Sequence, residues 1–153
     1  MEIEAKIAAL GLVLPELPPQ NTTRRVRFVK TGNLLFLAGH GPFKDGGYPV
    51  KGPVPVASTV EEARDATRYN ALALLSTVKL ALGDLDRVKQ IVKIVAYVNA
   101  VPGFQQASDV ANGCSDLLMD LYGERGRHAR SAVSVVGLAL NICCETEMVL
   151  EFE

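Results

Sequence analysis

Several residue types on which functional sites often depend are scarce in this chain of 153 residues. It has no tryptophan, two histidines and three cysteines, namely Cys114, Cys143 and Cys144. These cysteines form neither an even disulfide framework nor the spaced pairs of a zinc site, and the two histidines lie far apart in the sequence. We therefore expect three buried free thiols, no metal and no cofactor.

Net charge is nearly absent as well. The chain has 16 Lys and Arg against 17 Asp and Glu, which gives a formal net charge of -1 at pH 7. This balance argues against a surface built to bind a polyanion, so nucleic acid is not an expected partner.

No apolar run is long enough to span a bilayer, and the chain begins with acidic residues where a secretory signal would be basic. We expect a cytoplasmic protein without a membrane segment.

Length and apolar content indicate one main domain. Hydrophobic residues make up 48% of the chain, and a domain of this size buries roughly two thirds of its unfolded surface. Residues 2–11 carry a short apolar helical stripe, and the prolines at 15, 18 and 19 prevent regular structure after it. We expect residues 1–20 to form an N-terminal helix with a proline-rich linker, and residues 21–153 to form a single domain.

Periodicity within the domain predicts the order ββ, α, β, α, ββ. The expected elements are a strand from Thr22 to a turn at 31–33, a strand at 34–38, a helix at 58–82, a strand at 88–98, a helix at 104–121, and strands at 131–136 and 146–152. The first long helix is expected to begin at a capping box formed by Ser58 and Glu61. Because each long helix shows one apolar stripe, both helices are expected on one face of a mixed sheet, which is an α+β arrangement.

Arg130 lies at the start of an expected apolar strand, and Glu145 begins a strand that alternates apolar and acidic residues. If these strands pair as a hairpin turning near Leu140, Glu145 lies opposite Val135, roughly 17 Å from Arg130. A site that uses both Arg130 and Glu145 therefore needs a second copy of the chain. The central strand at 88–98 also indicates a second copy of the chain, because two helices on one side of the sheet leave the other apolar face of this strand uncovered. We expect several copies to share a barrel-like core.

The segment Ala129-Arg130-Ser131-Ala132-Val133, followed by Glu145-Thr146-Glu147, resembles the reactive intermediate/imine deaminase family, RidA or YjgF, whose older labels are endoribonuclease L-PSP and translation inhibitor. The resemblance continues in residues 31–39 and 83–89 and covers roughly Thr22 to Phe152. It implies a chorismate-mutase-like fold and a homotrimer with ligand clefts between subunits. The N-terminal helix is additional and indicates a divergent branch.

The resemblance also implies an activity and the residues that perform it. Arg130 would hold the carboxylate of a 2-enamino or 2-imino acid, and Glu145 would help to activate the water that hydrolyses it to a 2-keto acid and ammonia. The protein would then be a hydrolase acting on C–N bonds. The backbone at Gly39 and the side chain of Asn112 match further ligand contacts.

Three positions depart from the family pattern. Arg25 stands where a tyrosine usually lines the cleft, His40 replaces the usual glutamine, and Ala132 replaces a common cysteine. A second cation at Arg25 predicts a preference for a dianionic ligand. His40 could carry a proton beside Gly39 or could fill a turn. The departures leave the physiological substrate open.

The residues themselves leave alternatives. Arg130 is a planar, permanently charged fork suited to a carboxylate, but its spacing also fits a surface salt bridge. Glu145 acts as a base only if burial raises its pKa, and it also fits a solvated strand face. A second hypothesis is therefore a non-catalytic trimer that binds small carboxylates, as a sensor or chaperone. A third is a ribonuclease, against which the near-neutral charge and the lack of paired histidines in a basic groove both argue.

Overall fold

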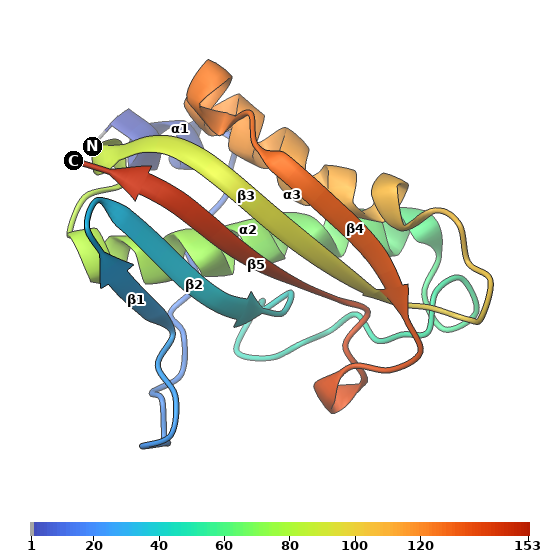
Figure 1. Cartoon of the computed structure of the whole chain (residues 1–153). Coiled ribbons are helices and arrows are strands. Elements are labelled where there is room, and N and C mark those ends of the chain that lie inside the picture. Colours follow the sequence, from blue (N-terminus) through green and yellow to red (C-terminus); the bar gives the residue numbers. More distant parts are fainter. Residues whose placement is uncertain (1) are drawn as a thin grey trace.

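The structure, a computed structural model, describes residues 2–153. One five-stranded mixed sheet has the order β1-β2-β5-β3-β4, and helices α2 and α3 cover one of its faces (Figure 1). The strands are β1 (Phe28–Thr31), β2 (Leu34–His40), β3 (Val88–Asn99), β4 (Ala129–Val135) and β5 (Cys144–Phe152). The helices are α1 (Glu2–Ala9), α2 (Val60–Leu82) and α3 (Ala107–Tyr122), with short 3-10 turns η1 (Leu85–Arg87), η2 (Gly123–Gly126) and η3 (Ala139–Asn141). The expected α+β class and the two long helices on one face are confirmed.

The last two strands are not neighbours, so the expected hairpin near Leu140 is wrong. Strand β3 lies between them, antiparallel to β5 and parallel to β4 (Figure 1). A long strand with apolar residues at both parities is best paired along both edges, and β3 is therefore central. Between β4 and β5 the chain passes through η3, where Leu140 and Asn141 have positive φ angles of 57° and 53°. This segment carries the chain past the end of β3 instead of turning it back beside β4.

Two other boundaries differ from expectation. The first strand begins at Phe28 rather than Thr22, because this edge strand pairs only with β2, from Phe28 opposite Leu37 to Thr31 opposite Leu34. Arg25 therefore lies before the strand. The turn between the two strands is confirmed, with Gly32 at a φ of 56°.

The capping box of α2 lies one residue later than expected. Thr59 Oγ1 accepts from the backbone N–H of Glu62 at 3.0 Å, and a carboxylate oxygen of Glu62 accepts from the backbone N–H of Thr59 at 2.8 Å. The hydroxyl of Ser58 donates instead to the carbonyl of Lys51. The helix ends as expected at Leu82, before a left-handed Gly83.

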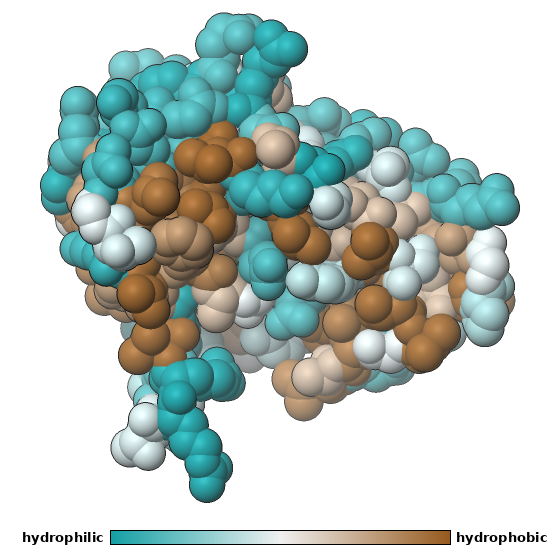
Figure 2. All heavy atoms as spheres, viewed as in Figure 1, coloured by the Kyte–Doolittle hydropathy of each residue, from teal (hydrophilic) through white to brown (hydrophobic). Residues whose placement is uncertain are grey.

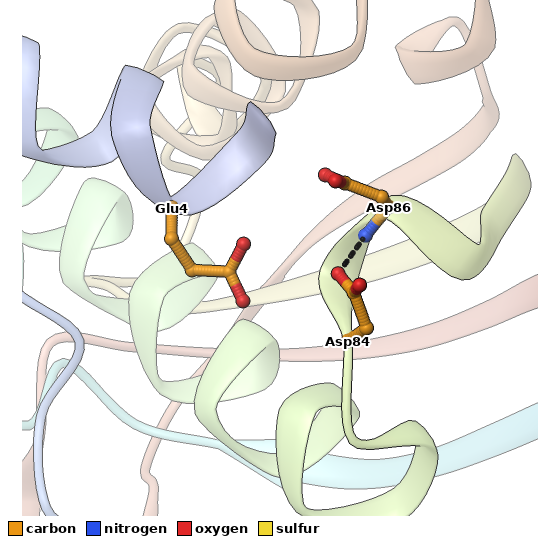
Figure 3. A group of neighbouring side chains, drawn as sticks. All are labelled: Glu4, Asp84 and Asp86. Carbon is orange, nitrogen blue, oxygen red and sulfur yellow. Dashed lines mark hydrogen bonds between the residues drawn. The ribbon is translucent and has the colours of Figure 1, made fainter. Parts of the chain in front are cut away.

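The N-terminal helix is packed against the domain. Ile3 and Ile7 are buried in the main core, and the Asp86 carboxylate on η1 accepts from the backbone N–H groups of Glu2 at 2.7 Å and Ile3 at 2.9 Å. Figure 3 shows Glu4 on α1 beside Asp86. A carboxylate at a helix start satisfies N–H groups that have no partner within the helix, so Asp86 fixes the place of α1.

The core lies between the sheet and the long helices, and the other sheet face is left open. On β5, Met148 and Leu150 are buried against the helices. On the open face, Phe36 and Val133 are each 42% exposed, and Figure 2 shows apolar side chains there interrupted by polar ones. Within residues 2–153, no helix combines the length and the apolar character needed to cross a bilayer.

Candidate functional site

Arg130 and Glu145 point to opposite faces of the sheet. Arg130 on β4 pairs with Ile94 on β3, and Ile94 pairs with Met148 on β5; both partners are buried on the helix side. Glu145 pairs with Tyr97, which lies three residues further along β3. Because side chains alternate along a strand and laterally paired residues share a face, an odd offset places them on opposite faces.

The distance between these residues follows from the same register. Arg130 and Glu145 are separated by three residues along β3 and by two strand spacings across it, which places their Cα atoms roughly 14 Å apart. The expected 17 Å was based on the wrong hairpin. The new register and the opposite orientations mean that one chain does not bring both side chains to one small ligand.

The first group of candidate residues surrounds Arg130 on the helix face. Its Nη1 donates to Asn112 Oδ1 at 2.8 Å and to Ser115 Oγ at 3.0 Å. Asn112 and Ser115 are three residues apart on α3, so they lie on the same side of that helix. Within residues 2–153, no hydrogen bond engages Nε or Nη2 of Arg130. The guanidinium is thus held at one nitrogen and has a free edge.

The second group lines a cavity of about 660 Å³ at the end of β2 and the start of β5, with Ala73 of α2 also in its wall. Arg25, Gly39, His40 and Glu145 all contribute to its wall. Residues 17–22 of the N-terminal linker form another part of the wall. The structure therefore brings together four of the six candidate residues and keeps Arg130 and Asn112 apart from them.

Glu145 is half-buried in this cavity. Burial raises the pKa of its carboxyl group, the negative charge of Glu147 raises that pKa further, and the positive charge of Arg25 opposes both effects. A carboxylate with a raised pKa holds a proton more readily near neutral pH, which is what a general base requires.

His40 makes contacts that favour a structural role over proton transfer. Its Nδ1 lies 2.7 Å from the Ala38 carbonyl oxygen and its Nε2 lies 2.7 Å from Thr77 Oγ1. Burial lowers the pKa of His40, so the ring is neutral at pH 7. Both nitrogens are engaged within the fold, and neither is directed to a ligand.

Two residues near Arg130 were missed by sequence reasoning. His128 Nε2 lies 3.0 Å from Ser115 Oγ, and His128 Nδ1 lies 2.6 Å from the Gly126 carbonyl oxygen. The available signals were weak, namely a serine three residues after Asn112 and a histidine two residues before Arg130. Neither spacing indicates that α3 and the start of β4 meet.

Among the described residues, the cysteines and one cluster of carboxylates are the remaining groups of the kind that ligate metals. All three cysteines are buried free thiols, as expected. The carboxylates of Glu4, Asp84 and Asp86 offer oxygens within 4.8 Å of one another (Figure 3). Asp86 uses its carboxylate to cap α1, as described above, and Asp84 accepts from the backbone N–H of Asp86 at 2.9 Å.

Residues 4–152 match the sequence model of the family described as "YjgF/chorismate_mutase-like, putative endoribonuclease". Protein TCP17 from Trypanosoma cruzi is 39% identical over 150 residues, which cover 97% of this chain and 93% of that protein.

Solved structures extend the likeness to the whole fold. A protein of unknown function from Agrobacterium tumefaciens is 35% identical with a TM-score of 0.92, covering 99% of this chain and 94% of that one. A "putative endoribonuclease" from Shewanella oneidensis is 28% identical with a TM-score of 0.93, covering 99% of this chain and 100% of that one. Coverage of 99% includes the N-terminal helix and linker. By its family match over nearly its whole length and by its relative at 39% identity, this chain belongs to the YjgF/chorismate-mutase-like family.

Proposed function

We propose that this protein hydrolyses reactive 2-enamino and 2-imino acids to 2-keto acids and ammonia, in a cleft completed by a second copy of the chain within a homotrimer. The observation that carries the proposal is the division of the candidate residues between two sheet faces. An anchored arginine lies on one face, and a half-buried glutamate that lines a cavity points to the other. Each is half of a site, and a neighbouring copy supplies the other half.

Arg130 is suited to hold the substrate carboxylate. Its Nη1 is already bonded to Asn112 and Ser115, so the plane of the guanidinium is set before a ligand arrives. The Nε and Nη2 groups are two parallel donors, which match the two oxygens of a carboxylate. A preset anchor reduces the ordering that binding requires and fixes C2 of the substrate in the cleft.

Glu145 is suited to accept a proton from water. A water molecule adds to C2 of the imine, and its proton passes by way of the Glu145 carboxylate to the imine nitrogen, which gives a neutral carbinolamine. Glu145 then takes the hydroxyl proton and passes it to the amino nitrogen as the C–N bond breaks, so that C2 becomes a carbonyl and the nitrogen leaves as ammonia. An imine and a water are thus converted to a ketone and ammonia, and Glu145 returns to its ionised form. The raised pKa of Glu145 favours both transfers.

The open sheet face supports assembly. It carries half-exposed apolar side chains, among them Phe36, Val92 and Val133. Several exposed apolar side chains gathered on one sheet face are typical of an interaction surface. A homotrimer that packs these faces together would form the expected barrel-like core. Because β4 is an edge strand, Arg130 would then lie at the border with a neighbouring copy, whose Glu145 could complete the cleft.

The experiment supplies freshly generated 2-aminoacrylate, or a longer 2-imino acid, and measures the release of keto acid and ammonia above the spontaneous rate. We expect acceleration by the wild-type protein and none by Arg130→Ala. The matched control is Arg127→Ala, because Arg127 is exposed and its side chain pairs only with Glu124 among the described residues. If the wild-type protein binds carboxylates but accelerates nothing, the deaminase proposal is wrong.

That outcome would favour the second candidate, a non-catalytic trimer that binds small carboxylates as a sensor or chaperone. The observation that favours it is Arg25, whose positive charge opposes the rise in the pKa of Glu145. The endoribonuclease description of the family has less support in this chain. Its two histidines, His40 and His128, both have their ring nitrogens engaged within the fold.

A further inference from the structure

A chain of hydrogen bonds runs behind Arg130, on the side away from its free edge. The carbonyl oxygen of Gly126, on η2, lies 2.6 Å from Nδ1 of His128. Nε2 of His128 lies 3.0 Å from the hydroxyl oxygen of Ser115, on α3. The same hydroxyl oxygen lies 3.0 Å from Nη1 of Arg130. Two segments, α3 and residues 126–130, therefore meet at one serine hydroxyl.

The direction of each hydrogen bond follows from chemistry. A carbonyl oxygen only accepts, so Nδ1 of His128 carries the hydrogen and Nε2 of the neutral ring is an acceptor. Burial lowers the pKa of His128, and the charge of Arg130 lowers it further, against the opposite effect of the Gly126 carbonyl. The ring is therefore neutral at pH 7. The Ser115 hydroxyl donates to Nε2, and its lone pairs face Nη1 of Arg130.

Two acceptors hold Arg130 more firmly than one. Nη1 carries two hydrogens, and one points to Asn112 Oδ1 while the other points to Ser115 Oγ. With Asn112 alone, the guanidinium could pivot about a single contact. With the serine hydroxyl oriented by the histidine, both hydrogens have a fixed partner.

We propose that Ser115 and His128 are positioning residues for Arg130, which together hold Nη1 so that only the Nε and Nη2 edge is presented to a carboxylate. The inference rests on the proposed function, in which Arg130 is the carboxylate anchor. Neither residue touches the substrate. Their contribution is to fix the hydrogen-bond directions around the residue that does.

The test measures the affinity of the full-length protein for pyruvate, a stable 2-keto acid, by calorimetry. Ser115→Ala and His128→Leu each remove a link, and we expect each to weaken binding about five- to tenfold, as the loss of one hydrogen bond does. Ser115→Thr keeps a hydroxyl and His128→Gln keeps an acceptor oxygen, so both are expected to bind within about twofold of wild type. Ser108→Ala, an exposed serine on the same helix, is the matched control.

The rescue pairs separate positioning from a general structural role. Equal losses in Ser115→Ala and Ser115→Thr, or in His128→Leu and His128→Gln, would overturn the inference, as would wild-type affinity in both Ser115→Ala and His128→Leu. Arg130→Ala tests the proposed function separately from the positioning role, because wild-type affinity in that variant would overturn Arg130 as the carboxylate anchor.

The ¹⁵N signals of His128 in the wild-type protein give a measurement that needs no variant. We expect the Nδ1–H tautomer, and a predominant Nε2–H tautomer would overturn the proposed direction of the chain.

Discussion

The carboxylate of Glu145 lies directly against the backbone of Gly39. A Cβ placed on Gly39 would stand 2.7 Å from Oε1 of Glu145 and 2.8 Å from its carboxyl carbon. The register between β2 and β5 shifts between Leu37 and His40, and Gly39 lies within that irregularity. Space, rather than an unusual backbone angle, is what requires a glycine here. The glycine in this irregularity of β2 thus leaves space for the proposed catalytic side chain of Glu145 on the neighbouring strand β5.

Gly39→Ala is expected to displace the Glu145 carboxylate. Because the crowded atoms are the far end of a flexible side chain, the free energy of unfolding should fall by less than about 1 kcal/mol. Imine hydrolysis should fall at least about tenfold, because a misplaced base transfers protons poorly. Gly47→Ala is the matched control, since a Cβ there meets no atom within 4 Å. Full activity in Gly39→Ala would show that the position of Glu145 is not critical.

Glu145→Gln tests the role of the carboxylate itself. The amide keeps the shape of the side chain but cannot accept the proton from water, so turnover should fall about a hundredfold or more. The affinity for pyruvate should stay within about threefold of wild type, because Arg130 holds the carboxylate of pyruvate. Calorimetry and the keto-acid assay measure the two effects separately. A loss of affinity as large as the loss of turnover would mean that Glu145 binds the ligand rather than the water.

The pH dependence of turnover should move in opposite directions in two variants. Turnover needs ionised Glu145, so it should fall as the pH falls through the raised pKa of that residue. Glu147→Gln removes a negative neighbour, lowers the pKa of Glu145, and should move the acid limb to lower pH. Arg25→Ala removes a positive neighbour and should move the acid limb to higher pH. Shifts in the same direction in both variants would contradict an electrostatic effect on Glu145.

Arg25 also predicts ligand preference. It lines the same cavity as Glu145 and adds a cation that a second carboxylate could meet. Arg25→Ala should therefore weaken binding of a dicarboxylate more than binding of a monocarboxylate. Arg24→Ala is the matched control, because Arg24 is exposed and does not line that cavity. Equal losses for both ligands would remove the preference for a dianion.

Residues in the N-terminal helix should contribute to the stability of the whole domain. Ile3 is fully buried in the main core, so Ile3→Ala should lower the free energy of unfolding by about 2–5 kcal/mol. Leu10→Ala, where the side chain is 46% exposed, should change it by less than about 1 kcal/mol. Denaturant unfolding measures both. Equal stability of Ile3→Ala and wild type would mean that α1 is a detachable appendage.

The sequence predicts elements well here and their neighbours poorly. The alternation through Met148 and Leu150 reports which face of β5 is buried, and the left-handed glycine after Leu82 marks the end of α2. Neither pattern indicates which strand lies beside β4, because that neighbour depends on which strands form backbone hydrogen bonds with the two edges of β3. The expected pairing of β4 with β5 was wrong for this reason, although the family resemblance had identified the fold.

The candidate site shows the same division. Residue types and family resemblance pointed to Arg130 and Asn112, and the structure places these two in contact. The hydrogen bonds from Ser115 to His128 could not be predicted, because they depend on the packing of α3 against the segment that precedes β4. The linker residues at 17–22 gave no local signal for the cavity that they line.

The central claim is that one site combines Arg130 of one copy with Glu145 of another, and complementation tests it most directly. Arg130→Ala and Glu145→Gln are each expected to be inactive alone. When the two variants are co-expressed and assemble at random, each head-to-tail interface of the trimer carries an intact Arg130 and an intact Glu145 in about a quarter of cases, so about a quarter of the wild-type rate should return. Oligomers that contain both variants and remain inactive would contradict a shared site.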